Sequence, residues 1–217
     1  MLKRLVFVAL IVSVVFAASM ASAYLVQLNY VKVDPAKVVT IGGTYYSGGV
    51  YAGNYVVDIA GMGRLYGYCV DPSNAPGSTK TYDLRPIPES TEGSGSGYEA
   101  AAWVLAQRYT GNHATAAQIA VWELVWDWES ENLANGNFTY SGSSYTAEVQ
   151  NIINAALAVN YSTFDHSGYR LAVSPPTDTF FRVNYQDYIV PIPIPAAAWL
   201  LGSGLIGLVI IRRRRKK

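Results

Sequence analysis

Residues 98–128 read YEAAAWVLAQRYTGNHATAAQIAVWELVWDW and show helical periodicity on both sides of Gly111. In the first half, apolar side chains recur on one face, which predicts a helix that starts at Tyr98 and is ended by Gly111. A second helix should begin near Thr115 and carry two distinct stripes. The first stripe is suited to a core and contains Gln118, Val121, Trp122 and Val125. The second stripe can face water and contains Glu123, Asp127 and Ser130.

The sequence on either side of this helical stretch has strand character. Alternating, Gly-punctuated segments predict strands at 24–33, 37–41, 45–58 and 66–70. Residues 71–97 are rich in Pro, Gly and Ser and should form a long exposed loop. Further on, a third helix is marked by Val149, Ile152, Ile153 and Ala156, and strands are expected at 169–173 and 179–190, with Pro175-Pro176 as the turn between them. This order predicts an α+β fold, with a β-sandwich or barrel-like sheet and a three-helix insertion.

Length and composition favour one exported domain. The chain has 217 residues, enough for one hydrophobic core between two targeting segments. Only 14% of the residues are charged, and six of the 16 Lys and Arg residues form the terminal run at 212–217. The remainder is mildly acidic, which argues against nucleic-acid binding. The 17 tyrosines and 19 glycines are typical of a β-rich extracytoplasmic domain.

The N-terminal residues have the three parts of a secretion signal. Residues 1–4 are a short basic stretch, 5–18 are almost unbroken apolar sequence, and 21–23 read Ala-Ser-Ala. We predict cleavage after Ala23, which makes residues 1–23 a signal peptide. An uncleaved membrane helix is the alternative, although the apolar run is short for a span.

The C-terminal residues predict a membrane anchor. Residues 190–195 read VPIPIP, 196–211 are an apolar run of sixteen residues, and 212–217 read RRRRKK. An apolar run of this length barely spans a bilayer, and the basic cluster should stay on the cytoplasmic side. The prolines favour extended backbone, so we expect a protease-accessible strip just outside the membrane.

This tripartite order resembles the PEP-CTERM sorting signal of Gram-negative bacteria, here at 189–217. The resemblance implies an exosortase that recognises Pro191, Pro193 and Pro195, removes the anchor and delivers residues 24–188 to the outer surface or an extracellular matrix. The central Glu of the motif is replaced by Ile192 or Ile194. A plain tail anchor is the alternative.

Cys69 is the single cysteine, so no internal disulfide is possible in a protein bound for an oxidising compartment. It lies in Tyr-Cys-Val-Asp at 68–71, at the end of a predicted strand, and Gln118 lies at the start of a predicted helix. A cysteine next to a carboxamide can displace ammonia and form an internal thioester. That bond stores an electrophile, because its carbonyl can acylate an amine or a hydroxyl on another molecule.

The same residues resemble the Cys-Gln thioester domains of bacterial surface adhesins. The matching segments are Tyr68-Cys69, residues 98–103 and Gln118 to Trp122, and the resemblance covers about residues 40–160. It implies a covalent tether with a Cys69–Gln118 cross-link, a dry pocket to which Tyr68, Val121 and Trp122 contribute, and a partner nucleophile. The Thr that the family places before its Gln is Ala117 in this chain. On this interpretation the protein is not an enzyme and has no cofactor.

Other interpretations of these residues remain open. Thr115 and Gln118 also fit a helix capping box, and a lone Cys among strand residues is most often a small buried hydrophobe. A matrix protein with an inert Cys and Gln is therefore the alternative function. A cysteine hydrolase with His113 or His166 has only residue order in its favour, and two His with one Cys give no zinc ligand set. Four tryptophans are expected in the core rather than on a sugar-binding surface: Trp103, Trp122, Trp126 and Trp128.

Overall fold

The computed structural model describes residues 24–44, 46–88, 96–128, 132–174 and 185–192. The expected signal peptide and most of the expected sorting signal, including Pro193 and Pro195, lie outside these residues. So does the expected turn at Pro175-Pro176.

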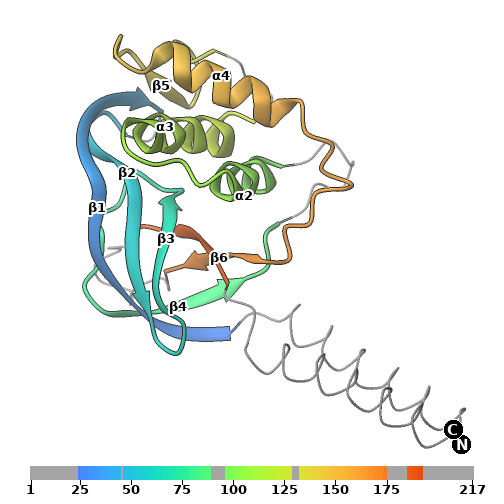
Figure 1. Ribbon diagram of the computed structural model, residues 1–217. Coiled ribbons are helices and arrows are strands. Elements are labelled where there is room, and N and C mark those ends of the chain that lie inside the picture. Colours follow the sequence, from blue (N-terminus) through green and yellow to red (C-terminus); the bar gives the residue numbers. More distant parts are fainter. Residues whose placement is uncertain (1–23, 45, 89–95, 129–131, 175–184, 193–217) are drawn as a thin grey trace, which may run out of the picture.

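The first half of the chain is antiparallel sheet. Its strands are β1 (Tyr24–Gly43), β2 (Gly48–Ile59), β3 (Gly63–Cys69) and β4 (Lys80–Arg85). The two strands expected at 24–33 and 37–41 are one continuous strand, β1, which curves along the whole sheet (Figure 1). One end of β1 pairs with β4, the middle pairs with β2, and the far end pairs with β5 (Phe138–Tyr140).

The strand pairings form a closed circuit. The order β2-β3-β7-β6-β4-β1 is completed by the β1–β2 pairing, and every pair is antiparallel. The two late strands, β6 (Tyr169–Val173) and β7 (Tyr188–Pro191), therefore lie between β4 and β3. The barrel-like alternative describes this circuit better than two facing sheets do. The predicted α+β class is confirmed.

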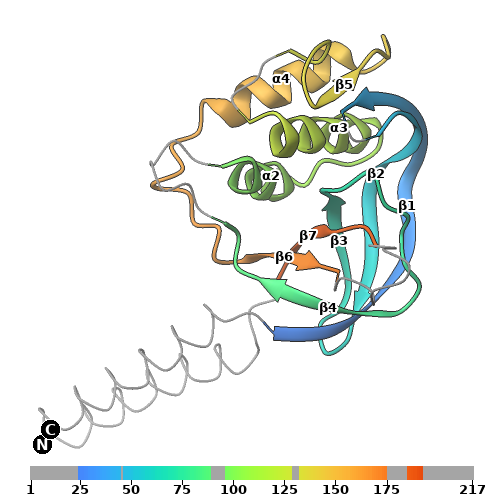
Figure 2. The same ribbon diagram turned by 180° about the vertical axis from the view of Figure 1, so that it is seen from behind.

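The helices form a layer on one side of the strands. They are α2 (Gly97–Ala106), α3 (Asn112–Trp126) and α4 (Thr146–Leu157). Figures 1 and 2 show α3 between the other two helices and above the ends of β2 and β3. The three predicted helices are therefore present, with α3 packed against α2, α4 and β2.

Two details of the helix prediction are wrong. Gly111 does not end α2, which finishes at Ala106; it is the N-cap of α3, where its φ of 58° suits a residue without Cβ. The helix thus starts at Asn112 rather than near Thr115. Glu123 does not face water: it is fully buried within the helical layer.

The expected loop at 71–97 is also partly wrong. Residues 80–85 form β4, with Tyr82 and Leu84 buried against the core. Their side chains alternate between the core and the outside, a pattern that the surrounding Pro, Gly and Ser residues concealed. At the other end, the expected domain boundary after residue 188 falls within β7, whose Ile189 and Val190 are fully buried. The folded part thus extends at least to Pro191.

The core is rich in aromatic side chains. The Tyr188 ring is tilted against the rings of Tyr55 and Tyr82, with ring centroids 5.6 and 6.0 Å apart. Tyr30 extends this series toward the surface, with its ring centroid 6.2 Å from that of Tyr55. The largest fully buried side chains come from both the sheet and the helices: Trp122, Tyr68, Tyr82, Tyr188, Phe138, Leu28, Ile59, Leu84, Ile119 and Leu124. One core thus joins the two layers.

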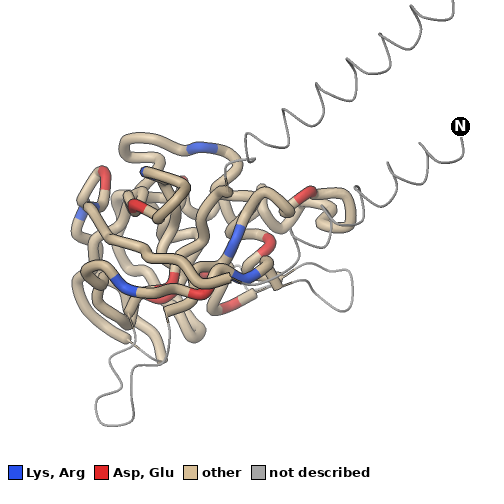
Figure 3. The backbone as a smooth tube through the Cα atoms, turned by 90° about the horizontal axis from the view of Figure 1, so that it is seen from below, with Lys and Arg blue, Asp and Glu red and all other residues tan. Residues whose placement is uncertain are grey.

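Acidic and basic residues are interspersed along the described backbone (Figure 3). Three exposed ion pairs join neighbours on the strands: Lys32–Asp34, Arg64–Asp58 and Arg85–Asp83. In the described part of the chain, no helix is both long enough and apolar enough to cross a bilayer.

Candidate functional site

Cys69 is the last residue of β3, and its side chain is fully buried. The strand is fixed on both sides, because Tyr55 of β2 lies opposite Gly67 and Tyr188 of β7 lies opposite Cys69. Gly67 is needed for this packing: a Cβ there would lie 2.4 Å from Ile189 O. The position of the Cys69 thiol is therefore set by a rigid strand end rather than by a loop.

Gln118 lies in the second turn of α3 and is also fully buried. Its side-chain amide pairs with both backbone groups of Cys69. The Cys69 N–H donates to Gln118 Oε1 at 2.9 Å, and Gln118 Nε2 donates to Cys69 O at 2.7 Å. The two residues, 49 positions apart in sequence, are thus in direct contact, and the carboxamide is held beside the cysteine in a fixed orientation.

This contact removes the capping-box alternative for Gln118. Thr115 is inside α3 rather than at its N-cap, and its hydroxyl lies 3.5 Å from Ala52 O on β2. Because both polar ends of the Gln118 amide bond to Cys69, the side chain does not cap the helix. The prediction depended on where the helix begins, and helix boundaries are the least certain part of a sequence pattern.

Two tryptophans on the same side of α3 complete the junction. Trp126 Nε1 donates to Val70 O at 3.0 Å, which clamps the residue after Cys69 to the helix. Trp122 is fully buried, with its ring 6.1 Å from Phe138. Gln118, Trp122 and Trp126 are spaced four residues apart and therefore share one helix face. Trp126 was expected only as a core residue and not as part of this site, although its spacing from Gln118 could have identified it.

Burial dominates the electrostatics of the Cys69 thiol and raises its pKa far above the ordinary value. The backbone N–H of Asp71 and the indole N–H of Trp122 act in the opposite direction and lower this pKa. Trp122 Nε1 has no partner with full hydrogen-bond geometry among the described residues, so it acts on the sulfur as a nearby N–H dipole. At neutral pH Cys69 is thus a protonated thiol, shielded from water.

Tyrosines cover the other side of the thiol. Burial raises the pKa of Tyr55 and of Tyr188 far above the usual tyrosine value, and the neighbouring Cys69 raises both further. Tyr55 is held in place because its hydroxyl donates to Tyr51 O at 2.9 Å. These residues come from strands far apart in sequence, and no local motif points to them.

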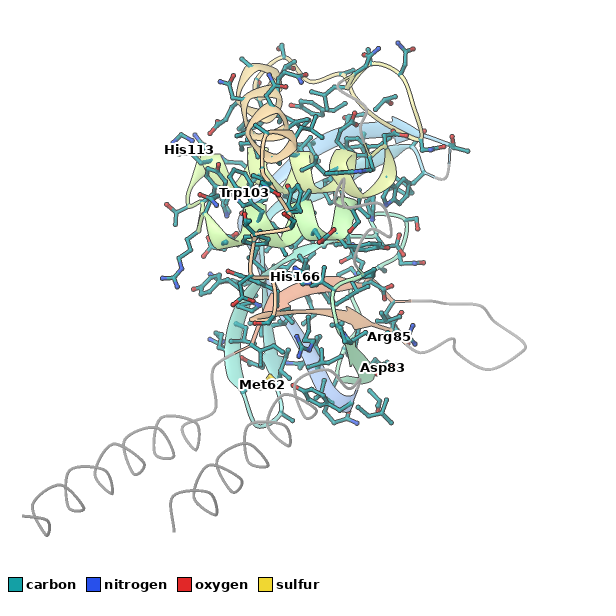
Figure 4. All side chains as sticks on the ribbon, turned by 90° about the vertical axis from the view of Figure 1, so that its right-hand side faces the viewer. Met62, Asp83, Arg85, Trp103, His113 and His166 are labelled. Carbon is teal, nitrogen blue, oxygen red and sulfur yellow. The ribbon has the colours of Figure 1, made fainter. Side chains whose placement is uncertain are left out.

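Both histidines have their described ion-pair contacts with glutamates of the helical layer. His113 lies in the first turn of α3, is largely exposed and pairs with Glu148 on α4. His166 Nδ1 lies 3.9 Å from Glu99 of α2. Figure 4 shows His113 at the outer side of the helical layer. In the described part of the chain the ion-pair contacts of the two histidines are thus with Glu148 and Glu99. Among the described residues, no group of three His, Cys, Asp or Glu side chains could hold a metal ion.

The remaining predicted site residues lie apart from the Cys69 sulfur. Val121 is fully buried in the helical layer. Tyr68 is buried on the opposite side of β3 and lines an open cavity of about 550 Å³. Pro191, the first proline of the expected sorting motif, ends β7 and lines the same cavity.

Comparisons with known proteins give little further information. No family model and no curated protein matches the chain. A structure described as the Bacillus anthracis TIE protein is similar with 14% sequence identity and a TM-score of 0.40 over 78% of this chain. This chain spans 39% of that structure's length.

Proposed function

We propose that this protein is an exported surface or matrix protein whose Cys69 and Gln118 form an internal thioester that bonds covalently to a partner. The observation that carries the proposal is the double hydrogen bond between the Gln118 amide and the Cys69 backbone in a fully buried junction. It supports the proposal because it holds the Gln118 carboxamide on the backbone of Cys69, the residue that carries the only thiol of the chain.

The reaction is balanced without a cofactor. The Cys69 sulfur attacks Gln118 Cδ, the Cδ–Nε2 bond breaks, and the thiol proton leaves on the nitrogen as ammonia. In the second step a partner amine or hydroxyl attacks the same carbon, the C–S bond breaks, and the displaced sulfur takes the partner's proton. The product is a covalent link between Gln118 and the partner, together with a free Cys69 thiol.

Burial explains how such a bond could be stored. Water that does not reach Gln118 Cδ cannot hydrolyse the thioester, and both residues are fully buried. The same burial means that a partner nucleophile reaches the bond only when the structure opens locally, for example between α3 and the end of β3. We therefore expect slow reaction with free small amines and faster reaction with a partner that stabilises the open form.

The terminal segments complete this proposal. Signal peptidase would remove residues 1–23, and an exosortase would act on the proline motif at Pro191, Pro193 and Pro195 before the anchor is discarded. The protein would be anchored in the inner membrane of a Gram-negative bacterium only transiently. Its covalent target would be an amine or hydroxyl at the outer surface or in the extracellular matrix.

The second candidate is a structural matrix protein with the same sorting signal and an inert Cys69. One observation favours it: two hydrogen bonds to the Cys69 backbone already satisfy the buried Gln118 amide and explain its presence without chemistry. In that case Gln118 only fixes α3 to the end of β3.

Intact mass spectrometry separates the two candidates. The thioester form is lighter than the sequence by one ammonia, lacks a titratable thiol after denaturation, and gains methylamine on Gln118. Cys69→Ala gives the clearer test. Both hydrogen bonds of the Gln118 side chain go to the backbone of residue 69, so the variant retains them. Gln118→Ala is less clean, since it leaves two buried backbone groups unpaired at about 1–3 kcal/mol each.

We expect Cys69→Ala to restore the full mass and abolish methylamine addition while the protein stays folded. Gln107→Ala, at the exposed end of α2, is the matched control and should keep the mass loss. Full mass and one free thiol in the freshly exported wild-type protein would exclude the thioester and leave the structural candidate.

A further inference from the structure

An open cavity lies beside β3, and neither Cys69 nor Gln118 belongs to its lining. It measures about 550 Å³ and lies between β3, the connection from α2 to α3, and the bend of β1. Four residues of β3 line it, Arg64, Leu65, Tyr66 and Tyr68, whereas Cys69 does not. Because side chains alternate along a strand, Tyr68 and Cys69 lie on opposite faces of β3. A cavity of this size is in the range of pockets that bury small ligands.

Four tyrosines are among the residues that line the cavity: Tyr66, Tyr68, Tyr109 and Tyr169. Tyr68 is buried at its base, Tyr66 is 51% exposed at its rim, and Tyr109 and Tyr169 are half-buried between them. The Tyr109 segment is fixed, because Asn54 Nδ2 donates to Tyr109 O at 3.0 Å. Tyrosines offer flat apolar faces together with hydroxyl groups at the ring edge, which suits a ligand that has both a ring and hydroxyls.

Among the described charges around the cavity, one cation has no ion-pair partner. Arg64 is held by Asp58 through two hydrogen bonds of 2.9 and 3.1 Å, and Asp34 is paired with Lys32. In the described part of the chain, Arg108 has no ion-pair partner, and its charge acts on Tyr169 across the cavity. One unpaired guanidinium suits a ligand with a single carboxylate rather than a polyphosphate.

The backbone at Arg108 supports a role in binding. Arg108 has a φ of 57° and is the one non-glycine residue with positive φ in the described part of the chain. It lies just beyond the C-cap of α2, Gln107, where glycine is the usual residue because it has no Cβ. Folding alone would favour glycine or asparagine here, so an arginine at a strained position facing a cavity indicates selection for its side chain.

We propose that this cavity reversibly binds an acidic saccharide, with the sugar ring against Tyr66 and Tyr109 and its carboxylate on Arg108. The inference goes beyond the covalent function and does not depend on it, because the cavity and the Cys69 thiol lie on opposite sides of β3. A protein that holds a matrix sugar at one site could acylate a neighbouring group at the other.

The test is calorimetric titration of the full-length protein with an oligogalacturonate and with a neutral oligogalactose of the same length. We expect the acidic oligomer to bind at least about tenfold more tightly than the neutral one, and the difference to shrink as salt is added. Arg108→Gly should remove the preference for the acidic oligomer while raising the melting temperature, because glycine relieves the positive φ. A loss of binding in a more stable variant cannot be explained by unfolding.

Arg85→Gln is the matched control: Arg85 is an exposed arginine at the end of β4, paired with Asp83 and not part of the cavity (Figure 4). It should bind both oligomers like the wild type. Equal binding of the two oligomers, no binding of either, or unchanged preference in Arg108→Gly would overturn the proposal. Equally tight binding of an oligoglutamate peptide would show an acidic-peptide site instead. Retained binding in Cys69→Ala would separate this site from the thioester.

Discussion

Tyr68 and Cys69 are adjacent residues of β3, yet they belong to two very different regions. Cys69 lies in a closed junction, where Gln118 bonds both of its backbone groups and Trp122 and Tyr188 exclude water. Tyr68 lies at the base of an open cavity that is also lined by exposed Tyr66 and by Arg108, which has no ion-pair partner among the described residues. The alternation of a single strand separates the two regions.

This difference shows what each region is suited to do. A closed, dry junction can preserve a reactive bond but binds nothing until it opens. An open aromatic cavity exchanges ligands freely but gives no protection from water. Changes in the closed junction should therefore cost stability and alter reactivity, whereas changes at the cavity rim should alter binding and leave stability almost unchanged.

The largest effect is expected for Trp122→Ala, which removes a fully buried side chain from the closed junction. We expect the free energy of unfolding to fall by about 3–5 kcal/mol, measured by urea denaturation. If the thioester forms, methylamine should also react faster, because the junction is less well sealed. Trp103→Ala on α2 is the control, since Trp103 is only half-buried and should cost less. If both variants lost the same free energy of unfolding, the junction around Trp122 would not be more tightly packed than the surface of α2.

A smaller effect that depends on pH is expected for Glu123→Gln. Burial, followed by the nearby charge of Asp127, raises the pKa of Glu123 from 4.5 to about 8, and neither carboxyl oxygen has a hydrogen-bond partner in the described part of the chain. Below pH 4.5 the carboxyl is neutral in the folded and unfolded states alike. As the pH rises from 4.5 to about 8, the unfolded chain ionises first, so the wild type loses stability.

The glutamine variant should not lose this stability. We expect it to be more stable than the wild type by about 1–3 kcal/mol near the upper end of that pH range, and nearly equal at the lower end. Urea denaturation at several pH values measures this difference. A constant difference at all pH values would mean that Glu123 does not titrate in this range.

The smallest effect on stability is expected for Tyr66→Ala at the cavity rim. Because Tyr66 is 51% exposed, its removal should change the free energy of unfolding by no more than about 0.5 kcal/mol. Binding of the acidic oligomer should nevertheless weaken, as measured by the same titration. Tyr68→Ala, at the buried base, provides the contrast and should be clearly destabilising. A large stability loss in Tyr66→Ala would mean that the rim is part of the core.

Much of the fold could be predicted from local patterns. Residues 169–173 were expected as a strand and form β6, and the three helices were identified from their apolar spacing. The failures occurred where tertiary contacts decide. Glu123 was expected in water because its neighbours on that stripe are polar, but the packing around α3 buries it completely. Residues 80–85 were expected in a loop, but β4 joins the circuit because β1 and β6 provide hydrogen-bonding edges.

The sequence by itself determined the α+β class and singled out Cys69 and Gln118 as a candidate reactive pair, because residue types and spacing carry that information. Only the tertiary structure decided that the two residues touch, since a contact over 49 positions depends on how α3 packs on the end of β3. The tertiary structure also created the cavity, whose tyrosines and Arg108 come from separate elements and have no common motif. Residue types and their local spacing can be read from the sequence. Which distant side chains come into contact depends on the packing of the whole core.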